Sequence, residues 1–92
     1  MKIEFDPDKD VANLVKHGLS LADAGRVYHA PNKVTLRSPR TGEDRALDIA
    51  LVETMGVVLA LVYVERNDVV RAISLRRASR QERRLYEDAK QD

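Results

Sequence analysis

The sequence predicts an α+β domain in which one antiparallel sheet carries helices packed mainly on one face. Apolar residues recur at helical spacing near both ends of the chain, whereas they alternate with a period of two between residues 33 and 76. The turns between the alternating segments are short, and short connections favour antiparallel neighbours. We therefore expect the order β-α-α-β-β-β-β-α within a single domain that spans residues 1–92.

A first strand is predicted at residues 2–5 and a first helix at residues 7–17. Asp6 and Pro7 are typical of a helix start, because an aspartate caps free amides and a proline costs nothing at the first helical position. Gly18 is typical of a helix end. The aliphatic residues at helical spacing between these signals are Val11, Leu14 and Val15.

A second helix is predicted from Ser20 to about His29. Ser20 and Asp23 resemble a capping box, in which two side chains bond to each other's backbone amides, and Pro31 forbids continuation of the helix. Its apolar face consists of Leu21, Ala24 and Tyr28. His29 has no motif around it, so we interpret it as a helix-end residue.

Four strands and a last helix are predicted in the remainder of the chain. The strands lie at residues 34–36, 45–52, 57–64 and 69–76, with turns at SPRTG, ETMG and Asn67-Asp68. The run from Val57 to Val64 is apolar on both faces, which is typical of a central strand. Ser79 and Glu82 form another capping-box pattern, so the last helix should run from there to about Lys90.

Alternation divides the predicted sheet into two faces. Large residues on one face are Leu47, Ile49, Leu51, Leu59, Leu61, Tyr63, Ile73 and Leu75; the other face carries Ala46, Asp48, Ala50, Val58, Ala60, Val62, Ala72 and Ser74. We expect the helices to cover the large-residue face, which leaves the small-residue face open. The same parity places Arg66 and Arg76 on the open face with Asp48. The alternative is a solvated face with incidental ion pairs.

Composition excludes several classes of site. The chain has 92 residues, of which 43% are hydrophobic and 34% charged, as in a soluble folded protein. It contains no cysteine and only two histidines far apart, so we expect no disulfide, no thiolate nucleophile, no metal site and no cofactor. Neither a signal peptide nor a membrane span is recognisable, and a cytoplasmic protein is expected.

Positive charge gathers near the end of a chain whose net charge is +1. Between Arg66 and Arg84 there are seven arginines against Asp68 and Glu82 alone. Such a local field can attract phosphates even when the whole molecule is nearly neutral.

Four strings along the chain together resemble the BrnT toxin family of bacterial type II toxin–antitoxin systems. The strings are FDPDKDVANLVKHGLSLADAGRVY, GEDR, LVYVER and RAISLRRASRQERRLYE. The resemblance runs from about Phe5 to Glu87. An asparagine and KHG at the end of the first helix, GExR, YxER and ISxRxAxxxER, all in this order, form a specific set. The chain departs from the family's pattern at Leu21, Ala50, Val57 and Val64; an arginine often stands at the position of Val57.

The resemblance implies a RelE-like fold and a ribonuclease that halts translation. It also implies a BrnA-like antitoxin with a ribbon-helix-helix DNA-binding domain, which neutralises the toxin and, in complex with it, represses the operon by binding operator DNA. Metal-independent RNA cleavage needs a group that takes the 2′-hydroxyl proton, cations that stabilise the phosphate, and an acid for the 5′-oxygen.

Several residues are candidates for these roles. The predicted catalytic residues are His17, Lys16, Arg76, Arg66 and Glu65, and the predicted RNA or phosphate contacts are Arg45, Arg77, Arg80, Arg83 and Arg84. Arg76 is the first choice for phosphate, because it ends a strand and its planar fork suits a phosphoryl group. His17 is a candidate proton-transfer group, because free histidine has a pKa near neutrality, although a histidine at a helix end can simply be a cap.

Structural interpretations remain open for the other candidates. Glu43, Glu65 and Asp48 could act as bases or could orient arginines, and ordinary ion pairs are the alternative for each. Tyr63 and Tyr86 fall on core-facing stripes. On a helical wheel the last three arginines lie on a face that solvation alone explains. Three functions remain: a ribonuclease toxin, a catalytically inactive RelE-like module that acts as an antitoxin corepressor, and, more weakly, a direct DNA-binding protein.

Overall fold

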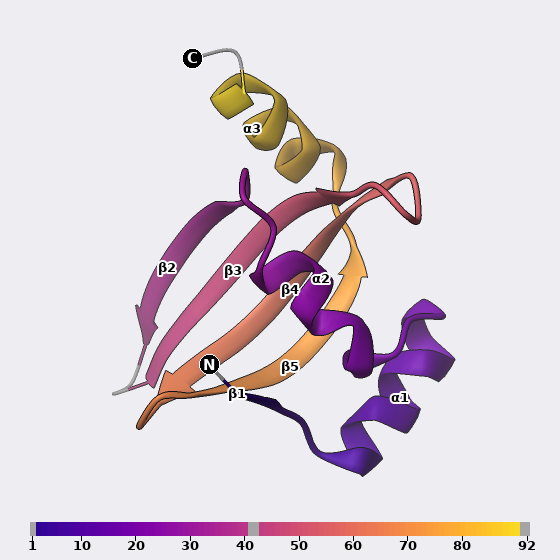
Figure 1. Ribbon diagram of the computed structural model, residues 1–92, viewed down its shortest axis with the longest axis vertical. Helices are drawn as coiled ribbons and strands as arrows, with labels where there is room; N and C mark the ends of the chain where they lie inside the picture. Colours follow the sequence, from indigo (N-terminus) through magenta and orange to yellow (C-terminus); the bar gives the residue numbers. More distant parts are fainter. Residues whose placement is uncertain (1, 41–42, 91–92) are drawn as a thin grey trace.

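The computed structural model describes residues 2–40 and 43–90, except for the side chains of residues 38–40 and 43. The elements are β1 (Lys2–Glu4), α1 (Pro7–His17), the 3-10 turn η1 (Leu21–Asp23), α2 (Ala24–Tyr28), β2 (Val34–Arg40), β3 (Glu43–Val52), β4 (Val57–Arg66), β5 (Val69–Arg77) and α3 (Arg80–Lys90). Figure 1 shows α2 in front of β3 and β4, α1 beside β5, and α3 near one end of the sheet. The predicted α+β class and element order are confirmed.

One sheet with the strand order β1-β5-β4-β3-β2 forms the centre of the fold. Strands β2 to β5 are antiparallel neighbours, as the short turns predicted, whereas β1 pairs with β5 in parallel. The turn between β4 and β5 holds Asn67 and Asp68 at φ 50° and 66°. Two residues with positive φ match the right-handed twist of the flanking strands.

The capping signals at the ends of the chain are confirmed, and those of the second helix are only partly so. The Asp6 carboxylate accepts a hydrogen bond from the Asp8 amide at 2.9 Å. Gly18 ends α1 in the left-handed region, at φ 71°. Ser20 caps η1 by accepting from the Ala22 amide, but Asp23 binds Arg26 instead of closing a capping box. The expected single helix is therefore a 3-10 turn followed by a short α-helix.

Strand β2 is longer than the sequence predicted, because residues 38–40 continue the pairing with β3. The first part of the predicted SPRTG turn is thus strand, and Pro39 lies in an edge strand, where a missing N–H is tolerated. Thr41 and Gly42, which complete that predicted turn, lie outside the described residues.

The predicted assignment of the sheet faces is confirmed for β4, Ser74 and Leu75, but it is reversed for β3 and Ala72. A four-residue turn joins β3 to β4 and pairs Val52 with Val57, so residues of opposite parity lie opposite each other. Asp48 is therefore opposite Leu61, and Ile49 is opposite Ala60. A bulge in β5 beside Val62 and Tyr63 changes the parity again.

We call one side of the sheet the covered face, because α2 packs on it and its residues are almost fully buried. Its members are Ala46, Asp48, Ala50, Leu59, Leu61, Tyr63, Val70, Ala72 and Leu75. Leu21, Ala24 and Val27 supply the opposing apolar surface of the core. Tyr63 and Tyr86 are buried, which confirms their predicted packing role.

The other side is the open face. Its half-buried members are Leu47, Leu51, Val58, Val62 and Ser74, and its buried members are Ile49, Ala60 and Val64. Helix α3 packs across one end of this side, against β3 and β2. The register thus gives the open face a mainly aliphatic floor that is only partly accessible.

Candidate functional site

Asn13 anchors the helix that carries Lys16 and His17. Its side-chain amide donates to the carbonyl oxygens of Leu19 and Leu75, at 2.7 and 2.8 Å, and its Oδ1 accepts from the Leu75 amide at 3.1 Å. Asn13 is 6% exposed. Because it satisfies both the N–H and the C=O of one strand residue, this side chain replaces a neighbouring strand along the edge of β5. The last turn of α1 is thereby fixed beside the sheet.

Lys16 and His17 line a shallow hollow of about 200 Å³ between α1 and β5. The other lining residues are Lys9, Ala12, Asn13, Ile73 and Ser74. Ser74 lies opposite Val62 and belongs to the open face. The hollow therefore connects the end of α1 with the open face, as a site shared by these two elements would require.

Three of the predicted arginines share the open face. Arg76 lies opposite Ala60, Arg45 lies opposite Val64, and Arg66 follows Val64 by two residues on the same strand. The predicted grouping of Arg66 with Arg76 on one face is confirmed. Asp48 belongs to the covered face and is 0% exposed, so its predicted place beside them is wrong.

Arg71 is an open-face arginine that the sequence reasoning did not select. It lies opposite Val64, in one row with Arg45 across three strands. Its guanidinium donates to Glu4 at 3.3 Å, between two half-exposed side chains. The sequence reasoning missed Arg71 because it did not have the register of β4 and β5, which places Arg71 on this face.

The carboxylate of Glu82 binds the guanidinium of Arg76. The two terminal nitrogens of Arg76 donate to the two carboxylate oxygens of Glu82 at 2.7 and 2.9 Å. The bond from Arg76, and further bonds from Ser79, hold the pKa of Glu82 at about 2. The same contact raises the pKa of Arg76. The guanidinium of Arg76, which we expected to bind phosphate, thus joins β5 to α3 in this structure.

The other predicted site residues are not gathered with these arginines. Glu65 follows the parity of Tyr63 on the covered side of β4 and lies 3.8 Å from the guanidinium of Arg37. Arg77 is opposite Leu59 and also points away from the open face. On α3, the side chains of Arg80, Arg83 and Arg84 are exposed, and Arg83 donates to the Ala78 carbonyl at 3.1 Å. The side chain of Glu43 lies outside the described part of the chain.

A buried polar cluster on the covered face was missed by the sequence reasoning. Asp48 accepts from Lys33 at 2.7 Å, from Thr35 at 2.6 Å and from the Tyr63 hydroxyl at 3.1 Å. The Lys33 ammonium also lies 4.1 Å from the centre of the Tyr28 ring. Burial and the Asp48 carboxylate raise the pKa of Tyr63. An aspartate amid apolar residues in a strand was the signal that could have indicated this cluster.

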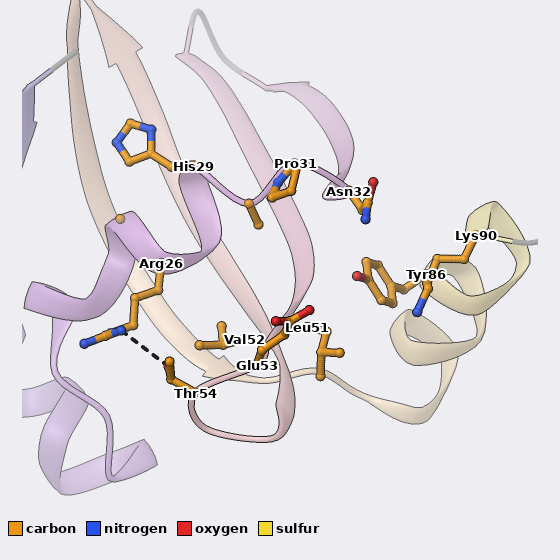
Figure 2. A pocket seen from close by; sticks show the side chains of 12 residues that line it. Arg26, His29, Pro31, Asn32, Leu51, Val52, Glu53, Thr54, Tyr86 and Lys90 are labelled. Carbon is orange, nitrogen blue, oxygen red and sulfur yellow. Dashed lines mark hydrogen bonds between the residues drawn. The ribbon is translucent and has the colours of Figure 1, made fainter.

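A separate cavity of about 420 Å³ lies between α2, the turn after β3 and α3 (Figure 2). Arg26 and Thr54 are bonded across its mouth at 3.4 Å. Tyr86 and Lys90 line it from α3, and His29 lines it from the end of α2. His29 caps the C-terminal end of α2, which confirms its interpretation as a helix-end residue. None of the described residues predicted for RNA chemistry lines this cavity.

Two further observations limit the chemistry and the setting. Within residues 2–40 and 43–90, no three histidine, aspartate or glutamate side chains lie close enough together to hold a metal ion. Over the same ranges, the structure contains no helix of the length and apolarity that crossing a membrane requires.

Comparison with known proteins identifies the family. The model of the family described as "Ribonuclease toxin, BrnT, of type II toxin-antitoxin system" matches residues 5–82, which is most of the chain. A search of curated proteins finds no match. The family is one of ribonuclease toxins, which implies endoribonuclease activity, an RNA substrate and a cognate antitoxin. The chain belongs to the BrnT family of ribonuclease toxins of type II toxin–antitoxin systems.

Proposed function

We propose that this chain cleaves RNA without a metal ion, in the cytoplasm, at the junction between the end of α1 and the open face. The observation that carries the proposal is the anchoring of α1 by Asn13, which places Lys16 and His17 beside Ser74. Arg45 and Arg66 lie further along the same face. The proposed site therefore combines a proton-transfer group at the end of α1 with cations on the open face.

In this mechanism the 2′-oxygen of a ribose loses its proton and attacks the adjacent phosphorus. The bond from phosphorus to the 5′-oxygen breaks, and a proton goes to that oxygen, so the products are a 2′,3′-cyclic phosphate and a 5′-hydroxyl. His17 is the proposed proton-transfer group, because an imidazole can both accept and donate a proton and His17 lines the hollow beside Ser74. Lys16 and the arginines stabilise the charge on the phosphoryl oxygens.

Arg76 has a different role in this proposal from the one that its sequence position indicated. Its guanidinium is bound to Glu82, so it contributes positive charge and rigidity rather than a free fork for phosphate. Glu65 lies on the other side of β4 from Arg66, which makes it a poor base for a reaction on the open face. These positions favour His17 over Glu65 as the proton-transfer group.

The family supports the remaining parts of the function. We propose that RNA cleavage inhibits translation and that a BrnA-like antitoxin with a ribbon-helix-helix domain neutralises the chain. In complex with that antitoxin, the chain would help to repress its operon by increasing the affinity for operator DNA. Membership of a type II toxin family supports these proposals.

Purified chain incubated with a defined RNA in EDTA tests the proposal directly. Cleavage that leaves a cyclic phosphate, together with growth arrest when the chain is expressed alone, is the expected result. Intact RNA, both free and in a translating extract, together with unimpaired growth, would rule out the proposed activity.

A catalytically inactive corepressor is the second candidate function. Two observations favour it: Glu82 occupies the fork of Arg76, and Val57 stands where the family often has an arginine. Under this alternative the antitoxin complex binds operator DNA, while the free chain leaves RNA untouched.

A further inference from the structure

Helix α1 exposes its aliphatic residues to solvent, whereas the polar residues Asn13 and Asp10 face the protein. Val11 is 61% exposed, Leu14 is 45% exposed and Val15 is 84% exposed. We call these three residues the α1 strip. They follow the i, i+3, i+4 spacing that places side chains on one face of a helix. A surface helix normally buries such a stripe, so this arrangement is the reverse of the usual one.

Polar contacts, rather than the α1 strip, hold α1 in place. Asn13 is bonded to Leu75 and Leu19, and Asp10 accepts from the Ser20 hydroxyl at 3.0 Å and from the Leu21 amide at 2.7 Å. The strip therefore contributes little buried area to the folded chain. Single exposed aliphatic residues are ordinary, but three adjacent ones on one helix face are typical of an interaction surface.

The strip and the proposed RNA site occupy different flanks of α1. Lys9, Ala12 and Lys16 line the hollow beside Ser74. At about 100° per residue, these three positions lie on the flank next to Val11 and Val15, with Ala12 only three residues from Val15. A protein could thus cover the strip while lying directly beside Lys16.

We propose that the α1 strip is the docking surface for the antitoxin, and that an amphipathic helix of the antitoxin packs against it. The proposal rests on the proposed function, because a type II toxin must bind a protein antitoxin. The charged residues beside the strip further define the chemistry of the partner. Asp6 and Asp8 border the strip at the start of α1, so the partner helix carries a basic residue opposite them. RNA is disfavoured here, because phosphates would meet carboxylates and aliphatic carbon.

A double substitution of the strip, Val11→Ser with Val15→Ser, tests the docking surface. The probe is the ribbon-helix-helix protein encoded beside the gene for this chain, titrated calorimetrically into purified chain. Loss of two central apolar contacts should weaken binding about tenfold to a hundredfold. The free double variant should fold normally and cleave RNA as the wild type does, because both side chains point into solvent.

Two matched controls address nonspecific loss of apolar surface. Met55 and Leu85 are 39% and 42% exposed and lie outside α1, so Met55→Ser and Leu85→Ser should leave antitoxin binding unchanged.

A charge reversal, Asp8→Lys, should weaken binding about threefold to tenfold at low salt and less at high salt. In cells, the double variant should arrest growth even when the antitoxin is co-expressed.

Other results would overturn the proposal. Binding of the double variant within twofold of wild type would remove the strip from the interface, as would failure of the wild-type chain to bind the probe. Unchanged antitoxin binding combined with a change from dimer to monomer in sedimentation would assign the strip to a second copy of the chain. Failure of RNA cleavage with strip-dependent binding intact would refute only the catalytic function.

Discussion

Arg76 and Glu82 form a bidentate ion pair that joins the last strand to the last helix, with nitrogen–oxygen distances of 2.7 and 2.9 Å. The same carboxylate accepts from the Ser79 amide at 2.8 Å, while the Ser79 hydroxyl accepts from the Glu82 amide at 3.2 Å. One carboxylate thus caps α3 and fixes an arginine of the open face. Two functions of the sequence motif, helix capping and arginine orientation, are combined in one side chain.

Replacement of Glu82 by glutamine should destabilise the chain by about 1–2 kcal/mol. The amide keeps one acceptor for the Ser79 cap but loses the charge and one of the two oxygens that bind Arg76. Urea unfolding of E82Q and wild type at pH 7 measures the difference. The control is Glu87→Gln, because Glu87 is exposed on the same helix. Equal losses in the two variants would contradict a specific role of the pair.

The difference between wild type and E82Q should depend on pH. The pKa of Glu82 is about 2 in the folded chain, lowered from 4.5, so ionised Glu82 stabilises the folded state. That contribution is fully present above pH 4.5 and is lost as the pH falls toward 2. Thermal unfolding of both proteins between pH 7 and pH 2 should therefore show converging stabilities. A constant difference over that range would contradict the lowered pKa.

Replacement of Asn13 by alanine should cost about 2–4 kcal/mol, because it leaves the Leu75 amide and carbonyl and the Leu19 carbonyl without their partner. Aspartate should be at least as costly, since a carboxylate cannot donate to either carbonyl. Denaturant unfolding measures both variants. Asn32→Ala serves as the control, because Asn32 is exposed. A loss below about 0.5 kcal/mol in N13A would show that water replaces the side chain.

The pair formed by Lys33 and Asp48 should show strong coupling in a double-mutant cycle. In Asp48→Asn the new amide donors face the Lys33 ammonium, so we expect a loss of about 3 kcal/mol. Lys33→Met leaves a buried carboxylate with only its two hydroxyl donors and should cost about 2–3 kcal/mol. In the double variant the clash disappears, and the loss should fall short of the sum by about 1–2 kcal/mol. Additive losses would exclude a direct interaction.

The local elements were predictable from sequence because their signals are local. Asp6, Gly18, Ser79 and the turn at Asn67-Asp68 each act within a few residues of their own position, and all of them behave as predicted. The faces of the sheet were not predictable to the same degree. They depend on how each turn closes. The four-residue turn that pairs Val52 with Val57 reverses the parity between β3 and β4, and the bulge in β5 changes it again.

Sequence reasoning could select candidate site residues, but it could not predict the long-range contacts that position them. Lys16 and His17 reach the open face because Asn13 bonds to Leu75, a contact across 62 residues that no spacing reveals. The partner of Arg76 is Glu82, only six residues away. The sequence indicated Glu82 as part of a capping box with Ser79, not as the partner of an arginine. The position of Val11 and Val15 was missed because helical spacing cannot tell whether the protein or a partner covers the apolar face.

The two histidines of the chain provide the sharpest test of the proposed mechanism, since each acts as the control for the other. His17 lines the hollow beside Ser74, whereas His29 lines the separate cavity between α2 and α3. Removal of a proton-transfer group costs about a hundredfold or more in rate, so His17→Ala should lower RNA cleavage by at least that factor. His29→Ala should leave the rate within about twofold of wild type, which gel assays with a labelled RNA in EDTA would measure.

A helix-capping role for His17 would give a different result. The loss of a cap lowers stability by about 0.5–2 kcal/mol but leaves the rate of the folded molecules unchanged. Cleavage rates should therefore be measured below the unfolding transition and over pH 5 to 9, where a proton-transfer group gives wild type a pH dependence that H17A lacks. If H17A keeps the wild-type rate and pH profile, and Lys16→Ala or Arg66→Ala abolishes cleavage, then the reaction depends on the cations and His17 only ends the helix.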